Sequence, residues 1–61
     1  MRKRELIAAR AKLGVSQATL AKLIGKHRGT VACYEIGTLA IPRTVELAVK
    51  YLLLTHQEKV S

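Results

Sequence analysis

The sequence predicts an all-α fold, a compact bundle of four or five short helices in which residues 1–61 form one domain. The chain contains no Trp and no Phe, so its core has to be largely aliphatic, which suits packed helices better than a β-sandwich. Apolar residues recur three and four positions apart, as on one face of a helix, and no stretch has the pattern of a strand. Gly14, Gly25 and Gly37 divide this pattern into segments of helical length.

The first helix is expected over residues 3–13, with Gly14 as its C-terminal stop, because glycine readily adopts the left-handed conformation that ends many helices. Arg10 is the one charged residue on its inner face, so that charge has to be matched within the fold. The other residues that share this face are Leu6, Ala9 and Leu13.

Two further helices are expected over residues 17–24 and 28–36. Ser16 caps the first of them, since its hydroxyl can accept a hydrogen bond from an otherwise unpaired amide of the first turn. Gly25 turns the chain, and the small Ala21 lets the two helices cross closely. Two short helices joined by a tight glycine turn form a helix-turn-helix. The residues expected to face the core from this pair are Leu20, Ala21, Ile24, Val31 and Tyr34.

A fourth helix is expected over residues 43–55, where Pro42 pins its start. In the loop before it, residues 38–42, the apolar Ile41 is expected to pack against the core. The tail over residues 56–61 carries little pattern and is expected to fray. The residues expected to be buried on this helix are Val45, Leu47 or Ala48, Tyr51 and Leu52.

The net charge of +7 is distributed unevenly along the chain. Residues 1–30 carry eight Lys and Arg against one Glu, whereas residues 31–61 carry three of each sign. This asymmetry indicates a polyanion at the N-terminal half. Because the charge and the helix-turn-helix fall in the same segment, double-stranded DNA is the expected partner.

Other classes of function find no support in the sequence. One Cys excludes an internal disulfide, and no Cys and His cluster has the spacing of a metal site. We expect no enzyme, cofactor or small-molecule ligand, because the chain has no phosphate loop or nucleophile motif and its four carboxylates are scattered. The basic start lacks the apolar stretch of a signal peptide, and no apolar run is long enough for a membrane span, so a cytoplasmic protein without a membrane partner is expected.

From residue 6 to residue 52, the order of these features resembles the DNA-binding domains of the phage repressor and Cro (XRE) family. The resemblance implies a lambda-repressor-like bundle and a sequence-specific transcriptional regulator, a repressor that acts as a homodimer on a palindromic operator. Two departures are visible: Lys26 replaces a small or apolar residue in the turn, and Gly29 and Ala32 leave the exposed face of the third helix nearly bare. The matching residues are Leu13 to Gln17, Leu20, Ala21, Gly25, Val31, Glu35, Gly37 and Pro42.

The third helix carries the expected base-reading residues, because a helix in the major groove reads bases mainly with its N-terminal residues. Arg28 is the sharpest candidate, since a guanidinium can bond guanine O6 and N7 together and so discriminate by about 1–3 kcal/mol. Ala32 and Cys33 offer small apolar surface to a thymine methyl group. The full expected set is His27, Arg28, Gly29, Ala32 and Cys33.

The resemblance also implies contacts with the DNA backbone and one structural ion pair. The family residue that matches Gln17 grips a phosphate, which suits the free amides and partial positive charge of a helix N-terminus. The residues matching Arg10 and Glu35 form a largely buried salt bridge that would fix the tilt of the third helix. The residues expected at phosphates are Ser16, Gln17, Lys26, Thr30 and Arg43.

The run Leu52-Leu53-Leu54 is too apolar for one buried stripe, because consecutive helical residues point about 100° apart. An exposed apolar patch often marks a contact surface. Since the family dimerises near this end, a dimer interface is expected at Leu53, Leu54 and Val60. Two alternatives stay open: an antitoxin-type regulator of a toxin–antitoxin pair, and a protein-interaction module that keeps the fold without binding DNA.

Overall fold

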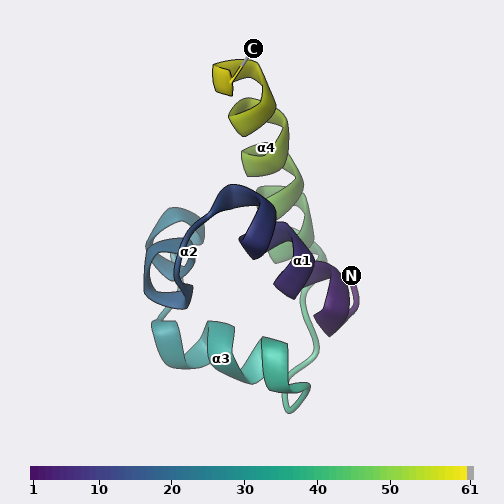
Figure 1. The fold of residues 1–61 in the computed structure, drawn as a ribbon. Helices are drawn as coiled ribbons and strands as arrows, with labels where there is room; N and C mark the ends of the chain where they lie inside the picture. The colour runs from purple at the N-terminus through teal and green to yellow at the C-terminus, as the bar shows by residue number, and fades with distance from the viewer. Residues whose placement is uncertain (61) are drawn as a thin grey trace.

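The computed structural model describes residues 1–60 of the chain, with side chains for residues 1–56. Figure 1 shows four helices, and residues 1–60 contain no strand, which confirms the predicted all-α fold class. In chain order the helices are α1 (Lys3–Leu13), α2 (Gln17–Ile24), α3 (Arg28–Ile36) and α4 (Arg43–Val60).

The first three helices occupy the ranges expected from the sequence, because capping groups and glycines fix their ends. Ser16 caps α2 as predicted, since its Oγ accepts a hydrogen bond from the Thr19 amide at 3.1 Å. Gly25 then ends α2 with a φ of 72°, and the chain turns directly into α3. His27, at the start of α3, makes no side-chain capping bond.

The C-terminal end of α3 is tied to the beginning of α1. Lys3 extends its side chain to this end, and its Nζ lies 3.5 Å from the carbonyl oxygen of Ile36. A cation here stabilises the partial negative charge of a helix C-terminus. Gly37 has a φ of 99°, and a Cβ atom added there would lie 3.3 Å from the Lys3 side chain. The positive φ favours glycine at this position, whereas the flexible Lys3 side chain can shift slightly to make room for a Cβ atom.

One small apolar core joins all four helices. α3 packs against α2 and α1, whereas α4 packs against α1 and, over a smaller area, against α2. Val31 and Tyr34 anchor α3 to this core, as the sequence predicted. The partly buried Ile41 packs against the core from the loop between α3 and α4. The buried residues are Leu6, Ala9, Leu20, Ala21, Val31, Tyr34, Val45 and Val49.

The buried face of α4 differs from the predicted one. Val49, which the prediction omitted, is fully buried, whereas Tyr51 is 65% exposed, so the prediction of a buried Tyr51 was wrong. The reason is the register of the helix: Val45 and Val49 lie four residues apart and face the core, and Tyr51 points away from them. Leu47 is also exposed, and Ala48 takes the half-buried position instead.

The second difference in α4 is its length. The helix continues past Thr55 to Val60, although the tail was expected to fray. No Gly or Pro follows Pro42, so the sequence contains no residue that would stop the helix. Figure 1 shows that this extension carries the end of α4 far from α3, at the opposite end of the molecule.

Candidate nucleic-acid interface

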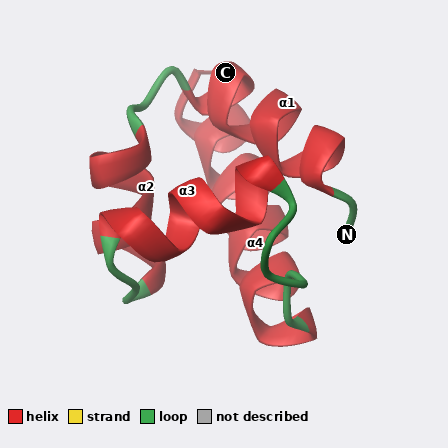
Figure 2. Cartoon of the chain, turned by 90° about the horizontal axis from the view of Figure 1, so that it is seen from below, coloured by secondary structure: helices red, strands yellow, loops and turns green. Residues whose placement is uncertain are grey.

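The third helix lies uncovered at one end of the molecule. Figure 2 views this end directly and shows α3 crossing the front, with the other helices behind or beside it. The C-terminal end of α4 lies at the back of this view. The outward face of α3 is therefore open to a partner.

The helical period determines which residues of α3 face outward. Because Val31 and Tyr34 point into the core, the opposite face presents residues 29, 32, 33 and 36. Gly29 is exposed, and Ala32 and Cys33 are half-buried. The outward face of α3 thus offers little steric bulk along its first two turns.

The expected base-reading residues lie together on this end of the structure. His27 and Arg28 are exposed at the N-terminal end of α3, next to Gly29, and Ala32 and Cys33 follow one turn later. Ile36 lies on the same face and is 66% exposed. The sequence analysis did not include Ile36, although its spacing of seven residues from Gly29 and four from Ala32 would have placed it there. Ile36 therefore adds an exposed apolar side chain to the outward face of α3.

Exposed cations lie at the N-terminal end of α3 and at the start of α4. Lys26, Arg28 and Arg43 are all exposed, and among residues 1–56 no salt bridge involves any of them. Lys22, on α2, is exposed as well. The positive charge of these side chains is therefore available to an anionic partner.

The beginnings of α2 and α3 add partial positive charge. The first amides of each helix lack an intrahelical acceptor, which is inherent in helix geometry. In α2 the Ser16 cap engages the Thr19 amide and leaves those of Gln17 and Ala18 open. In α3 the amides of Arg28 and Gly29 are open in the same way, whereas that of Thr30 donates to the carbonyl oxygen of His27 at 3.0 Å. Both helix starts are suited to a phosphate.

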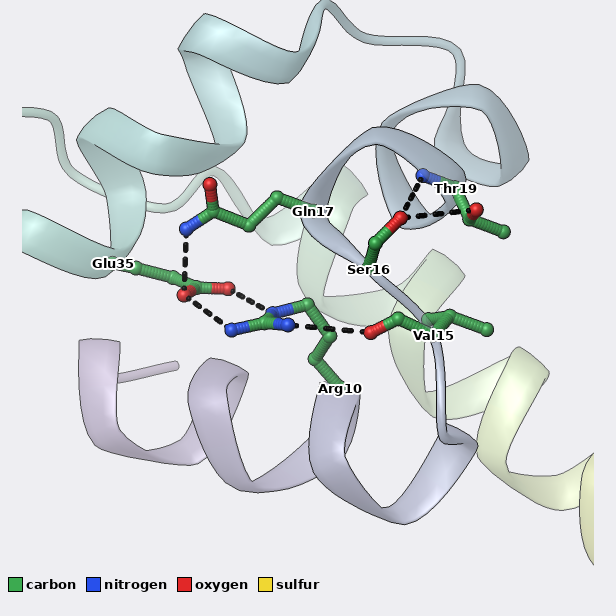
Figure 3. A network of polar contacts seen from close by, with 6 residues as sticks. All are labelled: Arg10, Val15, Ser16, Gln17, Thr19 and Glu35. Atoms are coloured by element: carbon green, nitrogen blue, oxygen red, sulfur yellow. Dashed lines mark hydrogen bonds and ion pairs between the residues drawn. The ribbon is translucent and has the colours of Figure 1, made fainter.

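The ion pair implied by the resemblance is present. Arg10 Nε donates to Glu35 Oε2 at 2.7 Å, and Arg10 Nη2 donates to Glu35 Oε1 at 3.1 Å, a two-bond geometry that favours a strong pair (Figure 3). Arg10 Nη1 also donates to the carbonyl oxygen of Val15 at 3.2 Å. The Glu35 side chain is only 7% exposed, whereas that of Arg10 is 27% exposed. The pair joins α1 to the C-terminal half of α3.

Gln17 makes a contact that sequence reasoning missed. Its Nε2 donates to Glu35 Oε1 at 3.0 Å, so the Glu35 carboxylate joins three helices (Figure 3). Burial raises the pKa of Glu35, but hydrogen bonds from Arg10 and Gln17, with the charge of Arg10, bring it below its ordinary value. The pKa of Arg10 is raised, chiefly by its hydrogen bond to Glu35. The carboxylate is therefore held ionised.

The expected dimer residues are in different environments. Leu53 is half-buried and packs against the core, whereas Leu54 is 57% exposed. One leucine of the run does leave the core, as the helical geometry requires. Val60 falls outside the residues whose side chains the structure describes.

The described residues lack two further kinds of feature. Within them, no cluster of three or more His, Cys, Asp or Glu side chains could hold a metal ion. No described helix combines the length and the apolar character needed to cross a membrane.

Comparison with known proteins gave one match. A family model with the description "Helix-turn-helix" matches residues 6–54, which include all of α2 and α3 and most of α1 and α4. No curated protein and no solved structure matches the chain.

Proposed function

The chain belongs to the repressor and Cro type of helix-turn-helix family, whose domains are DNA-binding regulators, and we propose that it is a sequence-specific transcriptional repressor. In this proposal it binds a palindromic operator as a homodimer and blocks transcription by occupying the promoter. No chemical step is required of the protein.

The observation that carries this proposal is the uncovered position of α3. The major groove of B-form DNA is about 12 Å wide and admits one α-helix. We place the N-terminal end of α3 against the bases, with Arg28 bonding a guanine and His27 and Gly29 beside it. Ala32 and Cys33 follow one turn later, where their small apolar surfaces suit thymine methyl groups.

We assign the phosphate contacts to groups at the starts of α2, α3 and α4. Lys26 and Arg43 supply full positive charges, and Thr30 supplies a hydroxyl group in the first turn of α3. The hydroxyl of Ser16 already accepts from the Thr19 amide and donates to Thr19 Oγ1. Ser16 therefore acts through its cap, and the open amide of Gln17 meets the phosphate.

Self-association is proposed through the outward face of α4. Leu47, Tyr51 and Leu54 are spaced by four and three residues, so they form one stripe, and each is more than half exposed. Beside the stripe, the Glu46 carboxylate pairs with Lys50 at 3.2 Å and with the N-terminal ammonium group of Met1 at 3.4 Å. A second copy is the occupant that suits this face, because the three exposed side chains of the stripe are apolar or aromatic and two copies can cover each other's stripe.

The stripe is too small to hold a dimer together alone. Even if each side chain buried as much area as a large aromatic residue, about 250 Å², three would fall short of the roughly 800 Å² per partner in a stable interface. We therefore propose that the dimer is weak in solution and is completed on DNA, where adjacent half-sites hold two copies together.

Selection of binding sites from random duplexes, repeated at several salt concentrations, tests the proposed function. We expect a recurrent palindrome with half-sites about one helical turn apart. The Arg28→Ala variant should lose base preference at one position in each half-site, at a cost of about 1–3 kcal/mol. Lys22→Ala is the matched control, because it removes an exposed cation of α2 and should leave the preference unchanged.

Two outcomes would contradict the proposal. Binding without any sequence preference would indicate an architectural DNA-binding protein. Failure to retain any duplex even at low salt would instead support a protein-interaction module.

A further inference from the structure

The side-chain amide of Gln17 has its direction fixed by another helix. Its Nε2 donates to Glu35 Oε1 at 3.0 Å, across the pair of helices that form the helix-turn-helix. The same carboxylate accepts two hydrogen bonds from Arg10. Gln17 is half-buried, and the Glu35 side chain is only 7% exposed, so the contact is partly shielded from water.

The chemistry of the two groups allows only one orientation of the amide. An ionised carboxylate can only accept hydrogen bonds, so Glu35 must face the nitrogen of Gln17 and not its oxygen. One proton of Nε2 is used in this contact, and the second remains. A phosphate oxygen is also only an acceptor, so this second proton is the one donor that the Gln17 side chain can offer to DNA.

We infer that Glu35 is a positioning residue for DNA binding, which holds the Gln17 amide ready to donate to a backbone phosphate. The inference rests on the proposed function. Glu35 itself does not touch the DNA in this arrangement. Its contribution is to prevent the amide from turning its oxygen toward the phosphate, which would repel it.

Arg10 makes this arrangement compatible with an anionic partner. A bare carboxylate behind the phosphate site would disfavour binding through its charge. The two hydrogen bonds from Arg10 pair that charge within the fold. The set of three residues therefore offers the phosphate an oriented N–H without a net negative charge behind it.

The test uses a duplex recovered by the site selection, made as a series in which one phosphate at a time is replaced by an uncharged methylphosphonate. Affinities of the wild-type protein and of Gln17→Ala across the series identify the phosphate that Gln17 contacts. Its replacement should weaken the wild-type protein roughly tenfold more than it weakens Gln17→Ala, because the backbone amide of residue 17 remains in the variant and only the side-chain hydrogen bond to a charged group is lost.

The Glu35→Gln variant is then measured on the same series. At the phosphate identified with Gln17→Ala, we expect the methylphosphonate to weaken Glu35→Gln only as much as it weakens Gln17→Ala. At the other contacted phosphates, the affinity losses should match those of the wild-type protein. A general loss of structure would lower the affinity for every duplex of the series. It would not abolish the effect of replacing one particular phosphate. Glu5→Gln, a carboxylate-to-amide change at an exposed position of α1, is the matched control and should keep the wild-type pattern.

A second variant covers the case in which Glu35→Gln does not fold, because it leaves Arg10 without its partner. Arg10→Met combined with Glu35→Leu removes both charges, an exchange that small proteins often tolerate. It should show the same selective loss.

The outcomes separate this inference from the proposed function. Suppose that a folded variant without the carboxylate loses as much affinity as the wild-type protein when the phosphate contacted by Gln17 is replaced. The inference is then overturned, while the proposed DNA binding stands. If the wild-type protein recovers no duplex, the proposed function fails and the inference fails with it.

Discussion

Arg10 interrupts the apolar face of α1, and the fold compensates its charge with hydrogen bonds. Two of these go to Glu35 and one to the carbonyl of Val15. The resemblance implied the partnership of Arg10 with Glu35. It did not include the contact between Gln17 and Glu35, because contacts between side chains on different helices leave no periodic signal in the sequence.

The Glu35 carboxylate predicts how stability responds to acid. Burial raises its pKa, but the hydrogen bonds from Arg10 and Gln17 and the charge of Arg10 hold it below the unfolded value of about 4.3. Its contribution to the free energy of unfolding is therefore complete above that value and is lost as the pH falls through the lower, folded pKa. Thermal unfolding measured from pH 7 to acid should show this loss.

The Arg10→Met variant provides the contrast in the same measurement. Removing Arg10 leaves Glu35 buried and unpaired, and we expect a loss of about 3 kcal/mol at neutral pH. Burial then raises the pKa of Glu35, so protonation should partly restore stability as the pH falls. Other carboxylates titrate in both proteins, so the difference between the two curves isolates Glu35. A parallel decline of both curves would contradict this account.

At the scale of helices, sequence reasoning worked best where a start or stop signal exists. Gly14, Gly25 and Gly37 mark the ends of the first three helices, and the Ser16 cap marks the start of α2. α4 lacks a stop signal, so its end could not be placed. Its register was also ambiguous, because apolar residues occur on both of its faces and periodicity alone cannot tell which face meets the core.

The two apolar faces of α4 lead to a prediction about cooperativity. Leu54→Gln removes an apolar side chain from the outward stripe, whereas Leu23→Gln changes a leucine of similar exposure on α2, 53% against 57%. We expect Leu54→Gln to lose cooperative binding to a palindromic duplex while keeping the affinity for a single half-site. Titrations of both duplexes, followed by gel mobility shift, measure the two quantities.

Leu23→Gln should retain the cooperativity of the wild-type protein. If both variants lose cooperativity equally, the loss comes from a general decrease in apolar surface and not from the outward face of α4. If Leu54→Gln keeps the cooperativity of the wild-type protein, the outward face of α4 is not the contact between copies.

At the scale of the whole molecule, the fold separates two surfaces. α3 lies uncovered at one end, close to exposed cations, and the end of α4 points away from it in Figure 1. DNA can therefore occupy α3 without contact with the distal part of α4. The fold class and the face that carries α3 were predictable from helical periodicity and glycine placement. The side-chain network behind that face required the structure.

The alkylation rate of Cys33 tests most directly whether the outward face of α3 meets the DNA. Cys33 is the one cysteine of the chain and lies half-buried on that face, so a maleimide reports on it alone. We predict that a selected duplex slows the reaction strongly, and that high salt, which releases the DNA, restores the rate of the free protein. An unchanged rate in a sample shown by mobility shift to be fully bound would mean that another surface holds the DNA, and would contradict the account.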